Sequence, residues 1–538
     1  MRFFAGFFDT LLSFTEQRKG GGTEAESAEA ESAEAWKPEA ESREHESRKR
    51  GSRKHRRVEA QQPKAGSTEV RKHMLWEQEG EQMTLKEVLA QEKENLLCSL
   101  RECVRIRSVR EEAEEGAPYG RGVRACLDYT LSLAKSLGLH CGELGHQVGW
   151  CEYGEGNEMV AVLGHLDVVP EGDGWTVDPY QGVIRDGKIY GRGTMDDKGP
   201  TIASIYALSA IQRLGLPVRR RIRVLFGTNE ETGSADMKYY RANGGEIPVA
   251  GFTPDGEYPL VNGEKGIVNV SFERDCVQRG ALRIRKISGG TAPNVVPDTA
   301  FAELSCDAKT AEAVLTLKEK QVRLIKTEYG VRMDAVGVSA HGSTPWQGEN
   351  AVGRLLLALH RLPFEGETGE LIAFLAERIG MECRGESLGI HLHDDISGDL
   401  SLNLGVLQAD ETRWKLVINF RYPVTKRYSD CGPKLKQQFE AAGFMLTDEV
   451  HKECLYVPAE SEMVKTLLAV YGEKTGLPAK PICIGGGTYA KMLPNIVAFG
   501  PIFPGDEVRE HKPDEYMEID RLMENADIFA EAMYRLAK

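Results

Sequence analysis

The sequence lacks closely spaced cysteines, long apolar runs and an excess of positive charge, and each lack excludes a class of protein. Its eleven cysteines are scattered, with no C-x-x-C spacing, which indicates neither a disulfide framework nor a cysteine zinc site. A reducing compartment fits best, so we expect a cytoplasmic protein. The net charge of −14 argues against a nucleic-acid partner. The apolar segment at 1–14 is too short to span a membrane and makes a weak signal peptide, so we expect no membrane partner.

Residues 1–82 differ in composition from the rest of the chain. From residue 20 onward they are biased toward Glu, Ala, Ser, Lys and Arg, with an acidic stretch before the basic cluster at 48–57. This composition predicts a low-complexity, disordered extension that cannot bury a core. Two alternatives stay open. One is a partner-binding arm, which the acidic balance of the chain disfavours. The other is a natural start at Met83, with the upstream part an artefact of start-site assignment.

Helical and strand patterns alternate along the first part of the chain. Asp186-Gly187 predicts the turn of a hairpin over 183–190. Strands that alternate with helices indicate an α/β core with a largely parallel sheet. The predicted helices cover 85–104, 122–137 and 200–214, and the predicted strands cover 159–163 and 221–226.

Beyond residue 261 the pattern changes to alternating strand candidates with helical segments between them. Helical patterns return near the C-terminus, at 460–476 and 516–536. A chain of 538 residues favours two globular units. We therefore expect a discontinuous catalytic domain with a mostly parallel sheet flanked by helices, interrupted by a large α+β insert. The expected bounds are 83–261 and 455–538 for the catalytic domain and 262–454 for the insert, whose strand candidates are 267–272, 281–287, 299–306 and 414–422.

Ionisable residues gather where predicted strands of the catalytic domain end, which is where ligands bind an α/β sheet. A hydrolytic site with two divalent ions about 3.5–4 Å apart needs a bridging carboxylate, further ligands and a base that is not a ligand. Imidazole and carboxylate suit zinc, and carboxylate-rich sets also suit manganese or cobalt. Two histidines and three carboxylates can serve as ligands here, with one acid left as the base. The residues at these strand ends are His165, Asp167, Asp196, Glu230, Glu231, Asp255 and His511, and the seventh of them, Asp167, could serve as the acceptor that orients His165.

Each motif taken alone also has a purely structural interpretation. The pair His165 and Asp167 is more often a structural hydrogen bond than a ligand pair. Asp196 and its neighbour could cap a helix, because an aspartate near a helix N-terminus is favourable without any metal. Glu230 and Glu231 alone would be a solvated loop. Their joint occurrence, in order and at strand ends, favours a metal site.

Five ordered motifs carry a family resemblance. They are GHLDVVP, GRGTMDDKGP, TNEETG, FTPDGEYP followed two residues later by NGEKG, and EH near the C-terminus. Together they resemble the co-catalytic metallopeptidases of the aminoacylase, acetylornithine deacetylase and carboxypeptidase G type. Within that group the chain looks most like the PepV-type dipeptidases, from about Met83 to the C-terminus. The resemblance implies a zinc-exopeptidase-like catalytic domain, an inserted lid domain and two divalent ions, zinc first and manganese or cobalt as alternatives.

The resemblance implies a role for each metal ligand. His165 and Asp255 would bind the first ion, and Glu231 and His511 the second. Asp196 would bridge both ions.

Three further assignments follow from the same resemblance. The residue after the bridge, Asp197, would not bridge. Asp167 would be the partner that orients the first histidine. Glu230 would be the general base that takes a proton from the water shared by the metals and passes it to the leaving amine.

The resemblance also implies roles in the insert and in a glycine-rich loop. His341 resembles the lid histidine that stabilises the oxyanion. Asn294 and Arg421 resemble positions that hold the substrate, and the arginine suits a free C-terminal carboxylate. Gly486 and Thr488 lie in GGGTYAK, which resembles the loop that lines the substrate cleft. A phosphate loop is the competing interpretation, but the pattern lacks G-K-[ST].

The predicted function is hydrolysis of dipeptides or short peptides with a free N-terminus. An enlarged lid supplies its histidine within one chain in PepV-type enzymes, so the resemblance implies a monomer. One alternative is a deacylase or desuccinylase of N-acyl amino acids with the same dinuclear site. The other is a pseudo-enzyme that only binds, which predicts a broken ligand or base, whereas every expected position is filled.

Overall fold

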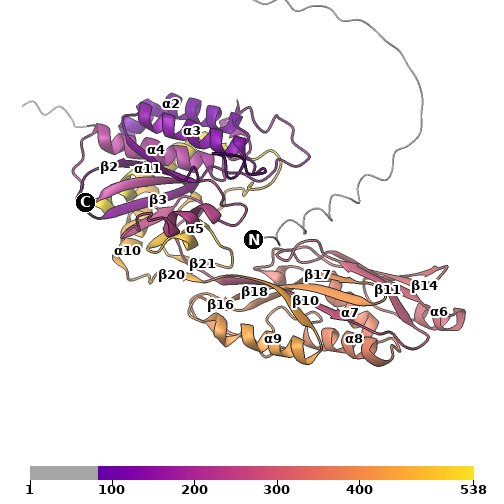
Figure 1. Ribbon diagram of the computed structural model, residues 1–538. Helices are drawn as coiled ribbons and strands as arrows, with labels where there is room; N and C mark the ends of the chain where they lie inside the picture. Colours follow the sequence, from indigo (N-terminus) through magenta and orange to yellow (C-terminus); the bar gives the residue numbers. More distant parts are fainter. Residues whose placement is uncertain (1–82) are drawn as a thin grey trace, which may run out of the picture. The chain divides into compact units, whose positions relative to one another are not determined.

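A computed structural model describes residues 83–538 of the chain. The extension expected over residues 1–82 lies outside the described part. Two large β-sheets organise the described residues, and each has its own hydrophobic core (Figure 1). No helix within residues 83–538 is long and apolar enough to cross a membrane.

The first sheet has nine strands, and its four central strands, in the order β6, β3, β7 and β22, run parallel. The outer neighbours β1, β2, β9 and β20 pair antiparallel, and β21 adds a parallel pairing to β9. The parallel centre agrees with the alternation of strands and helices in the sequence. In sheet order the strands are β1 (His140–Leu144), β2 (Val148–Tyr153), β6 (Arg221–Gly227), β3 (Met159–His165), β7 (Ala250–Thr253), β22 (Ile496–Ala498), β9 (Val261–Glu264) and β20 (Leu455–Tyr456), with β21 (Ile482–Ile484) beside β9.

Strand β3 is buried along its whole length because its two faces line two cores. Val160 and Val162 face the core formed with the large helices, while Ala161 and Leu163 face a smaller core with α5 and the turn at Tyr489–Met492. A strand covered on both faces reads as a continuous apolar run, as β3 does. The helices of this domain are α2 (Leu85–Arg105), α3 (Arg121–Ser136), α4 (Lys198–Arg213), α5 (Ala235–Ala242), α10 (Glu462–Thr475) and α11 (Ile519–Ala537).

Local signals set the ends of several of these elements. A capping box between Thr84 and Glu87 starts α2, and Gly476, with a φ of 69°, ends α10. The predicted hairpin is confirmed as β4 (Val183–Arg185) and β5 (Lys188–Tyr190). The helix predicted over 516–536 is wrong in its first turn. Residues Tyr516–Glu518 form β24, which pairs with β5, and the helix begins only after this strand.

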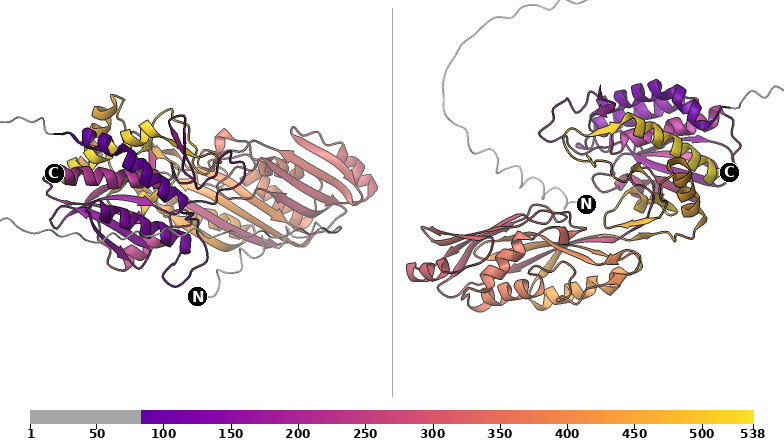
Figure 2. Two further views of the ribbon diagram at one scale, coloured as in Figure 1. Left: turned by 90° about the horizontal axis from the view of Figure 1, so that it is seen from above. Right: turned by 180° about the vertical axis from the view of Figure 1, so that it is seen from behind.

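The second sheet has eight strands, all antiparallel, with helices α7, α8 and α9 on one face (Figures 1 and 2). Strand β10 alternates buried and half-buried residues, as expected of a sheet with one covered face. Phe272 of β10 stacks on Phe439 of α9 with 4.3 Å between ring centroids. In sheet order the strands are β13 (Val322–Thr327), β14 (Gly330–Val336), β12 (Thr299–Ser305), β11 (Arg283–Gly289), β17 (Ser401–Ala409), β18 (Arg413–Tyr422), β10 (Gly266–Asp275) and β19 (Met445–Lys452), and the helices are α6 (Ala308–Leu315), α7 (Ala351–His360), α8 (Gly366–Arg378) and α9 (Gly432–Ala441).

The chain passes from the first sheet to the second between β9 and β10 and returns between β19 and β20. Lys491 joins the two crossings, because its Nζ donates to the carbonyl of Lys265 at 2.5 Å and to that of Glu453 at 3.0 Å. The fold is therefore an α/β catalytic domain, formed from two separate stretches of chain, with an inserted α+β domain.

Candidate active site

Three of the five candidate ligands come from the ends of adjacent strands, whereas Asp196 lies in the turn before α4 and His511 in the loop before β24. His165 ends β3, Glu231 follows β6, and Asp255 follows β7. These three strands lie side by side and run parallel. Their carboxyl ends therefore meet at one edge of the sheet, where α/β folds bind ligands.

His165 is fully buried and has one defined partner on each ring nitrogen. Its Nδ1 lies 2.9 Å from the carbonyl oxygen of Asp167, and its Nε2 lies 2.9 Å from Oδ1 of Asp196. A carbonyl only accepts hydrogen bonds, so Nδ1 carries the proton and Nε2 faces the carboxylate. Nε2 and that carboxylate oxygen could therefore both bind one cation.

Asp196 lies between two imidazoles, with one oxygen toward each. Oδ1 faces His165, and Oδ2 lies 3.0 Å from Nε2 of His511. The next residue turns away from this cluster. Oδ2 of Asp197 accepts the backbone N–H of His165 and the hydroxyl of Thr201, each at 3.0 Å.

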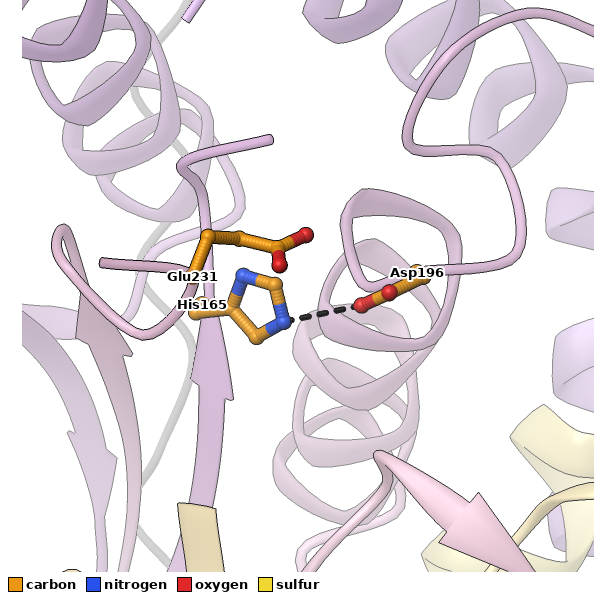
Figure 3. A group of neighbouring side chains, drawn as sticks. All are labelled: His165, Asp196 and Glu231. Carbon is orange, nitrogen blue, oxygen red and sulfur yellow. Dashed lines mark hydrogen bonds and ion pairs between the residues drawn. The ribbon is translucent and has the colours of Figure 1, made fainter. Parts of the chain in front are cut away.

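The remaining candidate ligands complete the cluster. Oε2 of Glu231 lies 3.2 Å from Nε2 of His511, and Oδ2 of Asp255 lies 3.8 Å from Nε2 of His165. Figure 3 shows His165, Asp196 and Glu231 converging, and each offers a ligand atom within 4.8 Å of the other two.

Charge and hydrogen bonding in this cluster fit divalent cations. Burial, and after it the charge of Asp196, raises the pKa of Glu231 and of Asp255. Hydrogen bonds to Asp196 and then to Glu231 raise the pKa of His511 to about 11. Oε1 of Glu231 is buried without a hydrogen-bond partner among the described residues. Buried carboxylate oxygens are costly unless a cation or donor satisfies them, and this donor set suits zinc, manganese or cobalt.

Asp167 holds the loop that carries the predicted base. Its Oδ1 accepts the backbone N–H of Glu230 at 3.0 Å, and its Oδ2 accepts that of Glu231 at 3.1 Å. The sequence predicts that Asp167 orients His165, and the structure shows that its carbonyl is the nearer acceptor, while its carboxylate lies 3.6 Å from Nδ1. The Asp167 carboxylate therefore orients the loop that carries Glu230 and Glu231 more directly than it orients His165.

Glu230 has the environment of a proton carrier. Burial, followed by the negative charges of Glu231, Asp167 and Asp196, raises its pKa to about 8, although the charge of His165 opposes this rise. A carboxyl group with such a pKa can take up and release a proton near neutral pH.

The predicted residues of the inserted domain lie close to one another. The segment of His341 bridges to Val295, and the backbone N–H of the next residue donates to the carbonyl of Asn294 at 2.7 Å. Burial, and then the charge of Arg421, lowers the pKa of His341. Its Nδ1 lies 2.7 Å from Oγ of Ser343. Among the hydrogen bonds and ion pairs of residues 83–538, none joins the side chain of His341 or Asn294 to the ligand cluster.

Arg421 is a buried guanidinium that touches the glycine-rich loop. Its Nη1 donates to the carbonyl of Gly485 at 2.5 Å, and its Nε donates to Oδ1 of Asn419 at 3.2 Å. Burial lowers its pKa to about 10, and no carboxylate of the described residues pairs with it. A buried positive charge without a counter-ion can bind an anionic ligand.

The glycine-rich loop also meets the inserted domain directly. A Cβ on Gly485 would lie 2.6 Å from Cβ of Ser343, so only glycine fits there, whereas a Cβ on Gly486 would make an ordinary contact with Cδ1 of Ile484 at 3.5 Å. The hydroxyl of Thr488 donates to buried Glu264 at 2.6 Å, and the backbone N–H of the same residue donates to Glu264 at 3.0 Å. The structure thus gives Thr488 an anchoring contact in place of a free donor for substrate.

Two buried acids that support the site were not found from the sequence. Oδ2 of Asp236 accepts the N–H groups of Thr228 and Asn229 at 2.6 and 3.1 Å and also accepts the hydroxyl of Tyr489. The Tyr489 ring in turn meets the ring of His165 edge-on, with 6.0 Å between centroids. The second acid, Glu515, follows the EH motif by four residues. The four-residue spacing from His511 is visible in the sequence, but it does not reveal which groups the Glu515 carboxylate contacts.

Several known proteins are similar in sequence to this chain. The model of peptidase family M20/M25/M40 matches residues 161–535, more than half of the chain. "Putative dipeptidase YtjP" of Bacillus subtilis is 37% identical over 460 residues, which cover 83% of this chain and 98% of that protein. "Beta-Ala-Xaa dipeptidase" of Lactobacillus delbrueckii is 33% identical over 468 residues, which cover 85% of this chain and 99% of that protein.

Solved structures share the fold at low sequence identity. Human carnosine dipeptidase 1 superposes with a TM-score of 0.52 at 16% identity, covering 84% of this chain and 98% of its own. Aminopeptidase PepT from Bacillus cereus gives a TM-score of 0.51 at 16% identity, covering 83% of this chain and 99% of its own. At this identity the likeness speaks for the fold alone.

Proposed function

The chain belongs to peptidase family M20/M25/M40, and on this premise we propose that it is a metal-dependent dipeptidase acting on dipeptides or short peptides with a free N-terminus. The observation that carries the proposal is the position of Asp196, whose two oxygens face His165 and His511 at 2.9 and 3.0 Å. Two relatives that align over almost their whole length bear the name dipeptidase.

Two divalent ions fit the donor set, and we propose zinc, with manganese or cobalt as alternatives. His165 and Asp255 would hold one ion, Glu231 and His511 the other, and Asp196 both. When bound, such ions polarise the peptide carbonyl and lower the pKa of water. The partnerless Oε1 of Glu231 supports this assignment, because a metal would satisfy it.

Glu230 is the proposed general base. Its carboxyl takes a proton from the attacking water and later gives it to the amine of the leaving amino acid. The two N–H···O bonds from its loop to Asp167 hold the backbone of Glu230 fixed during this exchange. Burial raises the pKa of Glu230 most, and the two proposed cations would lower it again, which leaves the carboxylate available as the base.

The inserted domain is proposed to hold the substrate. Arg421 offers a buried positive charge to the C-terminal carboxylate of a dipeptide, which supplies the missing counter-ion. His341 would donate to the oxyanion of the tetrahedral intermediate, and Asn294, which lies beside it, would hold the substrate backbone. Gly486 lies in the loop that Arg421 contacts through the adjacent carbonyl. A short peptide is therefore gripped at its C-terminal end, while its scissile bond faces the metal ligands.

We also propose that the enzyme acts as a cytoplasmic monomer. All eleven cysteines are free, which suits a reducing compartment. The resemblance to PepV-type enzymes also supports a monomer, because in those enzymes an enlarged lid supplies its histidine within one chain. Gel filtration with light scattering tests the monomer, and a dimeric mass would overturn it.

A dipeptide hydrolysis assay combined with metal analysis tests the proposed activity. The purified chain should release free amino acids from unmodified dipeptides, lose activity with a chelator and regain it with zinc, manganese or cobalt ions. N-acyl amino acids serve as the matched substrates. Cleavage of these alone, with dipeptides untouched, would replace the dipeptidase by a deacylase. Metal binding without hydrolysis of either class would indicate a binding protein.

A further inference from the structure

The segments that carry the metal ligands are tied to one another by carboxylates that are not themselves ligands. Asp167 accepts N–H groups from the segment of Glu231, and Asp197 accepts the N–H of His165. Each acid follows a ligand of one segment and holds the backbone of another. A third such acid, Glu515, follows His511.

Glu515 is fully buried, and both of its oxygens are used. Oε1 accepts the backbone N–H groups of Gly193, Met195 and Asp196 at 3.0, 2.9 and 3.2 Å. Oε2 accepts from Nη1 of Arg192 at 2.6 Å. The carbonyl of Glu515 also accepts the N–H of residue 191. The turn at residues 191–196 is therefore held by hydrogen bonds to this one residue.

Arg192 extends this connection to a third segment. It is fully buried, and its Nη2 donates to the carbonyls of Pro170 and Glu171 at 3.4 and 3.2 Å, in the loop that follows His165. The pair Arg192 and Glu515 thus contacts three ligand-bearing stretches, at 165–171, 191–196 and 511–515. An ion pair that only stabilised the core would need no contact beyond the one between its two side chains.

We propose that Glu515, acting through Arg192 and the backbone N–H of Asp196, is a positioning residue that fixes the distance between Asp196 and His511 for metal binding. This inference rests on the proposed function, because it assumes that the cluster binds metal. Groups that orient metal ligands typically change metal affinity about 10–100-fold when removed. Glu515 fixes the backbone of the ligand that both ions share, so its effect extends to both.

The test is cobalt binding to the metal-free full chain, measured by titration calorimetry and by the visible absorption of the bound ion. Glu515→Gln keeps the shape and one acceptor but removes the charge. We expect its affinity for cobalt to fall about 10–100-fold, with an altered absorption spectrum. With saturating metal, kcat for a dipeptide should fall while KM stays nearly constant.

Glu152→Gln is the matched control. Glu152 is a mostly buried acid that accepts from Arg221 and Arg223 at 2.8 Å each, and none of these residues contacts the ligand cluster. We expect this variant to unfold at a lower temperature and to bind cobalt as the wild type does. Glu515→Gln behaving in the same way, with wild-type cobalt affinity and spectrum, would overturn the proposal.

Arg192→Lys keeps the test decisive if Glu515→Gln does not fold. It preserves the buried positive charge but loses the planar fork that joins Glu515 to the 170–171 carbonyls. We expect a smaller fall in cobalt affinity, and an unchanged affinity would contradict the proposal. Failure of the proposed function looks different: the wild type would bind cobalt but cleave no dipeptide, or would bind no cobalt at all.

Discussion

The catalytic domain and the inserted domain supply their functional residues in contrasting ways. In the catalytic domain the candidate ligands are mostly buried at strand ends, and carboxylates of neighbouring segments hold their backbones. In the inserted domain, His341 and Asn294 are exposed, lie in loops outside the strands, and make their described contacts within that domain. The proposed metal centre is thus built into the catalytic domain, whereas the proposed substrate contacts depend on a separate domain. Variants of the two regions should therefore fail in different ways.

The largest effect should come from Glu230→Ala. Loss of the base should lower kcat by about 10⁴-fold, the upper end for general acid–base catalysis. Metal content should stay at the wild-type value, because Glu230 is not a proposed ligand. Steady-state assays and elemental analysis measure the two quantities. Full activity in this variant would end the proposed mechanism, and loss of metal would make Glu230 a ligand instead.

His341→Ala should give the next largest effect, through the inserted domain. Removing one donor to a developing oxyanion costs about 10²–10³-fold in kcat. The metal centre lies on the other domain, so cobalt affinity should not change. A fall in cobalt affinity equal to that of a ligand variant would break the contrast between the regions.

Arg421→Met should act mainly on substrate binding. A hydrogen bond to a charged group contributes about 1.5–3 kcal/mol, so KM for dipeptides should rise by roughly 10–100-fold. The matched substrates are dipeptides whose C-terminus is an amide, for which wild type and variant should differ little. An equal loss for acid and amide substrates would remove Arg421 from the carboxylate site.

The smallest effect on activity should come from Thr488→Val. The hydroxyl donates to buried Glu264, so its removal should lower the free energy of unfolding by about 1–3 kcal/mol. The value of kcat/KM should stay near that of the wild type. Urea unfolding and initial rates measure the two quantities. A large rise in KM with unchanged stability would restore the substrate contact that the sequence suggests.

Residue patterns predict the parts of this molecule that local chemistry determines. The apolar run before His165, the hairpin at Asp186-Gly187 and the amphipathic helix from Leu85 are all found in the structure. The strand-end positions of His165 and Glu231 follow from the same patterns, because parallel strands end at one edge of a sheet.

Contacts between distant segments could not be predicted in this way. Nothing in the sequence distinguishes Glu515 and Asp236 from other acidic residues, because it does not reveal which backbone N–H groups donate hydrogen bonds to them. The segment at 516–518 reads as the start of a helix, but pairing with β5 makes it a strand. For Asp167, the sequence indicates a partner of His165 and leaves open whether the carbonyl or the carboxylate makes the contact.

We propose that Asp196, and not Asp197, joins two metal ions. A crystal structure of the protein soaked with zinc, with anomalous maps collected at the zinc edge, tests it directly. We expect two anomalous peaks about 3.5–4 Å apart, as in other two-metal sites, with one oxygen of Asp196 on each. A single peak, or a pair of peaks bridged by Asp197, would contradict it.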